Sequence, residues 1–172
     1  MRFKLIALCA LLACGAIGAA SAAAAPAGGK IFIHATGSEG PAGTIVIVGA
    51  IADHGKTLQM NKNGKPDSNG NFVKITLSKG TFMVDSTKLD AAGNQAKPSI
   101  ESLATCSFRF TATGPVTFFN GTGLYKGISG TATITLDFGG YSRLSRAGKC
   151  SQNAPAVAEW GSVTGPGTVS FG

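Results

Sequence analysis

Short runs in which apolar and polar residues alternate dominate this chain of 172 residues. In the clearest run, Val73, Ile75 and Leu77 alternate with Lys74 and Thr76. A period of two puts the apolar residues on one face of a strand and the polar residues on the other, as a half-buried strand requires. No window has a sustained helical period. Alternating or fully apolar runs predict strands at residues 31–34, 44–48, 73–77, 81–85, 105–113, 116–119 and 131–138, and one or two more within 157–171.

The residues between these runs are turn formers. Ser78-Lys79-Gly80 is a short turn between two predicted strands, which are therefore expected to form a hairpin. Gly114-Pro115 separates two further predicted strands, and Gly165-Pro166 is expected to break the last segment. The polar stretches at residues 61–71 and 90–99 are predicted to be exposed loops.

These elements predict an all-β fold, a single closed antiparallel barrel of about eight strands. A barrel of that size is just filled by side chains or holds one small ligand, and its closure removes exposed strand edges. A β-sandwich is the alternative that the pattern leaves open. Residues 44–48 are apolar on both faces, so a terminal segment or a second subunit is expected to cover the outer side of that strand.

The first 24 residues have the pattern of a secretory signal peptide. Arg2 and Lys4 form a positive region, residues 5–13 are apolar, and Ala20-Ser21-Ala22 begins a string of small residues suited to signal peptidase. We therefore expect a secreted protein, periplasmic or extracellular. In this division residues 1–24 are the signal, 25–40 are an N-terminal extension with the first strand, and 41–172 are the barrel domain.

A lipoprotein signal is the alternative reading of this leader. Ala13 is a small residue before Cys14, and Gly15 follows it. Lipidation at Cys14 would convert a released protein into one anchored in the envelope, and membrane contact is expected only in that case.

Cys106 and Cys150 are the two cysteines that remain after removal of the leader. Two cysteines in an oxidising compartment most simply pair, and closing this loop would stabilise the fold by about 4 kcal/mol in the chain-entropy model. Two buried free thiols are the alternative. The cysteines and the distant His34 and His54 lack the spacing of metal ligands, so no metal site is expected.

Charge and short motifs exclude several classes of function. The formal net charge of +7 falls to +5 without Arg2 and Lys4, and the remaining basic residues are scattered, which argues against a nucleic-acid partner. The sequence has no Gly-x-Ser-x-Gly elbow, no His-Glu-x-x-His and no phosphate-binding loop. No catalytic residue and no cofactor are therefore predicted.

A glycine-rich run between two predicted strands is the most distinctive stretch, and it contains Gly121, Gly123, Tyr125, Gly127 and Gly130. So many glycines in so short a span predict a tight corner or positive φ angles. This structural motif resembles the Gly-Thr-Gly-aromatic-x-Gly pattern of the allene oxide cyclase-like and dirigent-like barrels, especially their bacterial secreted branch. Residues 77–82 and 105–110 are similar to segments upstream of the glycines in that branch.

The resemblance covers residues 40–170 and implies an eight-stranded, calycin-type barrel with an apolar cavity. In the plant relatives that cavity serves the cyclisation of a fatty-acid epoxide or the coupling of phenoxy radicals. No pocket residue of those enzymes matches a position here. Binding of a small apolar ligand is the leading expectation, with a cavity lined by side chains such as Phe108, Phe110, Phe118 and Ile134. The alternatives are an isomerase or cyclase, and a structural or envelope-interacting protein without a ligand.

Overall fold

The computed structural model describes residues 27–38, 40–97, 99–145, 147–150 and 156–172. Within them, one helix, α1 (Thr87–Gln95), and one 3-10 turn, η1 (Gly123–Tyr125), accompany a single antiparallel sheet. Its strands are β1 (Gly29–Ser38), β2 (Ala42–Gly49), β3 (Asp53–Met60), β4 (Phe72–Leu77), β5 (Gly80–Asp85), β6 (Ser99–Ser102), β7 (Ser107–Phe119), β8 (Ile128–Ser142) and β9 (Ala156–Phe171).

The sheet closes on itself, which confirms the predicted barrel. Its strand order is β5-β4-β3-β2-β1-β9-β8-β7-β6, and β5 also pairs with β7. Eight strands therefore form the closed antiparallel barrel, and β6 is added to β7 outside the ring. Because β1 pairs with both β2 and β9, the first strand, which the sequence places within residues 25–40, is part of the barrel.

Alternation decides which side chains face the interior. In β4 and β5, Ile75, Leu77, Phe82 and Val84 are buried, and Ile75 is opposite Phe82 in the register. The predicted hairpin is thus present, with Ser78 and Lys79 as its turn. Inward side chains from every strand of the ring except β3 build one apolar core.

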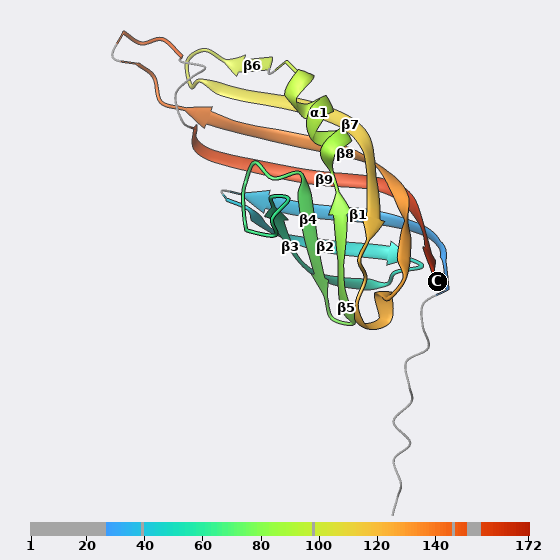
Figure 1. The fold of residues 1–172 in the computed structure, drawn as a ribbon. Coiled ribbons are helices and arrows are strands. Elements are labelled where there is room, and N and C mark those ends of the chain that lie inside the picture. Colours follow the sequence, from blue (N-terminus) through green and yellow to red (C-terminus); the bar gives the residue numbers. More distant parts are fainter. Residues whose placement is uncertain (1–26, 39, 98, 146, 151–155) are drawn as a thin grey trace, which may run out of the picture.

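The barrel is held closed by a short ladder. Only Met83, Val84 and Asp85 of β5 pair with β7, while β7, β8 and β9 continue well past the shorter strands (Figure 1). Helix α1 packs beside β7 where β5 has ended, and it buries Leu89. A Cβ atom at Gly114 of β7 would lie 2.8 Å from the Cα of Leu89, so this glycine permits the close approach of the helix.

The expected breaks at the two Gly-Pro pairs are wrong, because β7 and β9 each run through theirs. Between its pairings with β6 and β5, β7 is bonded to β8 alone, so Pro115 lies where one side of the strand needs no donor. In β9, Gly165 and Pro166 are not paired with β8, so Pro166 also lies where one side of its strand needs no donor. Proline is tolerated where the missing N–H would not serve a ladder.

Helix α1, strand β3 and the short strand β6 were not predicted. The stretch at residues 90–99, expected to be a loop, holds most of α1, which buries only Leu89 and contains Gly93, so it has little helical periodicity to detect. Strand β3 carries Gly55, Thr57 and Gln59 in alternation, where an apolar face would be expected. The polar loop at residues 61–71 does lie between β3 and β4 as predicted.

Candidate functional site

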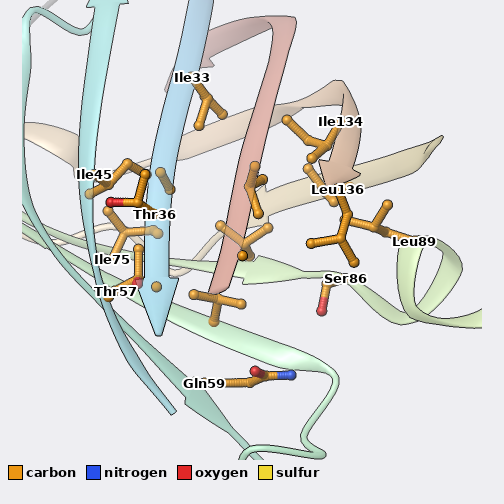
Figure 2. A pocket seen from close by; sticks show the side chains of 18 of the residues that line it. Ile33, Thr36, Ile45, Thr57, Gln59, Ile75, Ser86, Leu89, Ile134 and Leu136 are labelled. Carbon is orange, nitrogen blue, oxygen red and sulfur yellow. The ribbon is translucent and has the colours of Figure 1, made fainter. Parts of the chain in front are cut away.

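A cavity of about 310 Å³ occupies the barrel from its middle to one end, which we call the mouth. Its inner part is lined by side chains from strands that are far apart in the sequence. Ile33 of β1, Ile45 of β2 and Ile134 of β8 face this space in Figure 2. Other apolar residues of the lining are Ala35, Ile47, Val73, Ile75, Phe82, Val84, Leu89, Val116, Phe118, Leu136, Phe138 and Val163.

Polar side chains lie at the mouth and are held in place by hydrogen bonds. Gln59 Nε2 donates to the carbonyl of Gly70 at 2.7 Å. Ser86 Oγ, just before α1, lies 2.7 Å from Asp90 Oδ2, and the amide of Asn71 donates to the same oxygen at 3.0 Å. Gln59 and Ser86 stand at the same end of the cavity in Figure 2. The mouth is therefore a fixed polar rim around an apolar interior.

Of the four residues that were expected to line a cavity, two lie in its lining and two do not. Phe118 and Ile134 lie in the lining. Phe108 and Phe110 do not, although they share the inward face of β7. They lie on the extension beyond the closed ring and pack on Phe138, with ring centroids 6.2 and 5.2 Å apart. Phe138 lines the cavity and was missed by the sequence analysis.

The opposite end of the barrel is closed by a buried pair, Asp53 and Tyr125. Tyr125 is 1% exposed and its hydroxyl donates to Asp53 Oδ2 at 2.5 Å. Ser78 Oγ donates to Asp53 Oδ1 at 2.6 Å, and the backbone amides of His54 and Lys79 donate at 2.8 and 3.1 Å. One carboxylate thus ties β3, the β4–β5 turn and η1 together.

Electrostatics keeps this pair in one protonation state. Burial by itself would raise the pKa of Asp53, but the hydrogen bonds from Ser78, Tyr125, His54 and Lys79 outweigh it and hold that pKa well below its usual range. Burial raises the pKa of Tyr125, and the hydrogen bond to Asp53 and its negative charge add to this effect. The pair is a carboxylate and a neutral phenol at any ordinary pH.

The glycine run forms the turn that delivers Tyr125 to this end. Gly123, Gly127 and Gly130 have φ angles of +60°, +75° and +136°. A Cβ atom at Gly121 would lie 1.7 Å from the carbonyl oxygen of Tyr125. The Tyr125 ring meets Phe82 edge-on, with centroids 5.7 Å apart. Because Phe82 also lines the cavity, it stands between the cavity and the Asp53–Tyr125 pair.

Cys106 and Cys150 form the predicted disulfide, with a Cα–Cα distance of 5.3 Å. It joins the start of β7 to the segment between β8 and β9, on the extension and away from the ring. A disulfide indicates an oxidising compartment. The predicted signal peptide and Cys14 lie outside the described residues.

The outer surface carries one ion pair among the described residues. Arg109 donates to Asp137 through Nε at 2.8 Å and Nη2 at 2.5 Å, and its guanidinium lies 5.9 Å from the Trp160 ring. Arg109, Gly139 and Trp160 are register neighbours across three strands. A Cβ at Gly139 would lie 2.9 Å from the indole nitrogen, so Gly139 gives Trp160 room to lie across the sheet.

No group of three potential metal ligands occurs in the part of the chain that the structure describes. The helices among those residues are too short and polar to cross a membrane.

A scan of protein-family models, a search of curated proteins and a search of solved structures each found no match to this chain. Fold and site therefore define the class: a disulfide-bonded, closed eight-stranded antiparallel barrel with an apolar cavity open at one end.

Proposed function

We propose that this chain is a secreted barrel protein that binds a small apolar or amphiphilic ligand inside the barrel. The observation that carries the proposal is the cavity, whose volume of about 310 Å³ lies at the lower end of the range for ligand pockets. Its interior is apolar and its polar groups gather at the mouth, which is the usual division between burial and orientation in such sites.

The distribution of ionisable groups favours binding over the alternative of an isomerase or cyclase. Catalysis by proton transfer needs ionisable side chains beside the reacting atoms. In the described chain the cavity has ionisable residues only at its mouth, Asp90 and Glu159. Asp53 and Tyr125 lie beyond Phe82 and already satisfy each other.

Compartment and family are part of the same proposal. The disulfide and the leader at residues 1–24 together support export. Kinship with the allene oxide cyclase-like and dirigent-like barrels is supported by the glycine turn, but closed barrels occur in many families, so the function rests on the cavity alone.

An exposed apolar surface on the outside of the barrel supports a second candidate function. In it the protein acts through contacts with the envelope or with another copy of itself. Phe32, Val46 and Val48 on the outside of β1 and β2 are 46%, 49% and 53% exposed. The predicted cover over residues 44–48 is thus not supplied by the described residues of this chain. A shallow groove on the same outer side includes Phe32, Val48 and Pro166.

A chain-length series tests binding in the barrel. For n-alkanols of six to twelve carbons, we expect the dissociation constant measured by calorimetry to fall about fourfold with each methylene, since each buried methylene contributes about 0.8 kcal/mol. The gain should stop near ten carbons, because 310 Å³ holds about ten water-sized groups at ~30 Å³ each. Alkanols that show no binding, or no dependence on chain length, would refute the proposal.

A further inference from the structure

The charge at the mouth narrows the class of ligand, provided that the proposed binding in the barrel holds. Asp90 and Glu159 are the ionisable side chains that line the cavity in the described chain, and both are acidic. We propose that the cavity takes single-chain amphiphiles with an uncharged or cationic head group and discriminates against the matching carboxylates. A fatty acid anion is therefore the wrong ligand for this barrel.

Asp90 is fixed in place at the mouth. It lies in the first turn of α1, the helix that packs against β7 beside the opening. Ser86 and Asn71 both bond to its Oδ2 atom, at 2.7 and 3.0 Å. These neutral donors orient the carboxylate without cancelling its charge.

Glu159 reaches the cavity from a different element, β9. In β9 it alternates in step with Gly161 and Val163, which also line the cavity. Across the ladder it is opposite Gly140, over which the Phe108 ring packs. Glu159 therefore belongs to the inward face of the strand extension, next to the mouth.

Neither carboxylate forms an ion pair with a described residue. The ion pair among those residues is Arg109–Asp137, on the outer face. Among the residues that the structure describes, neither Lys nor Arg nor His lines the cavity. An anionic head group held at the mouth would meet two like charges at the edge of an apolar space, where screening by water is reduced. An alcohol avoids this repulsion, and an ammonium group reverses it.

The test compares three ligands that share one chain length: decanol, decylammonium and decanoate, measured by calorimetry at pH 7 in low salt. We expect decylammonium to bind at least as tightly as decanol, and decanoate to bind about 30-fold more weakly, the size of a unit-charge repulsion across several ångströms of partly screened space. Removing the charges with the Asp90→Asn, Glu159→Gln double variant should abolish most of the difference between decanoate and decanol when both are measured on that variant.

Two further variants make the result specific. Glu159→Gln alone, which leaves the bonds of Ser86 and Asn71 intact, should recover part of the decanoate affinity. Asp67→Asn, which removes an acidic residue from the β3–β4 loop outside the cavity, should change nothing. Decanoate that binds the unaltered protein as tightly as decanol would overturn this inference and leave the proposed function standing. Failure of all three ligands to bind would instead overturn the proposed function.

Discussion

Replacing Asp53 with alanine is expected to lower the free energy of unfolding by about 4 kcal/mol, because it leaves several buried donors without an acceptor. Those donors are the Tyr125 and Ser78 hydroxyls and the backbone amides of His54 and Lys79. Tyr125→Phe removes one bond to a charged group, so we expect a loss of about 2 kcal/mol. Urea denaturation followed by circular dichroism measures both values.

The same carboxylate predicts how stability depends on pH. The folded state holds the pKa of Asp53 well below its unfolded value of about 3.9. A lowered pKa gives stability that is fully present above the unfolded value and is lost as pH falls below it. The unaltered protein should therefore lose stability below about pH 4, and Asp53→Asn should show a shallower loss in that range.

Asp67→Asn is the matched control for this prediction. Asp67 accepts a hydrogen bond from the amide of Asn69 in an exposed loop, a role that asparagine also fills. Its stability and acid profile should match those of the unaltered protein. An Asp53→Ala variant as stable as this control would show that the closed end does not depend on the carboxylate.

Ala35→Phe is expected to weaken decanol binding about 1,000-fold, since its ring would displace about five chain methylenes worth ~0.8 kcal/mol each. Ala35 lines the cavity from β1, between Ile45 and Val163 in the register. Because the new ring enters existing space, the midpoint of urea unfolding should change little. Calorimetry and denaturation of the same sample separate the two effects.

Two comparison variants keep this prediction falsifiable. Val163→Phe fills the cavity from β9 and should also weaken binding strongly. It replaces Ala35→Phe in the test if that variant does not fold. Val46→Phe adds the same kind of ring to the outside of β2, where Val46 is 49% exposed, and should leave decanol affinity unchanged. If only Val46→Phe lost decanol binding, the binding site would have to be assigned to the outer surface of the barrel.

The barrel could be predicted from the sequence because most of its strands have an apolar face. The β4–β5 hairpin shows this most clearly, since Ile75, Leu77, Phe82 and Val84 alternate around a short turn. Strand β3 lacked that signal because Gly55, Thr57 and Gln59 occupy one of its faces. Its Thr57 and Gln59 line the cavity near the mouth, where an apolar face is not required.

The extent of the cavity could be predicted only in part. Phe108, Phe110 and Phe118 share one face of β7, so periodicity treats them alike. Only Phe118 lies where β5 closes the ring, at its pairing with Val84. The point at which two strands part depends on contacts between distant segments, and α1, which fills the gap, gave no periodic signal of its own.

The role of Asp53 in closing one end of the barrel could not be predicted from the sequence either. It stands between Ala52 and His54 in a stretch without strong pattern, and its partner Tyr125 is 72 residues away. The glycine run predicted a tight turn, and the positive φ angles at Gly123, Gly127 and Gly130 agree with that expectation. Only the structure shows that this turn places Tyr125 against Asp53.

Nuclear magnetic resonance of isoleucine methyl groups during a decanol titration tests the central claim most directly. Ile33, Ile45, Ile75 and Ile134 line the cavity, whereas Ile51 and Ile128 are buried elsewhere in the core. We predict saturable shifts and ligand contacts for the first four methyl groups, with little change at the other two. Saturable binding that leaves all four of these isoleucines unperturbed would contradict the account.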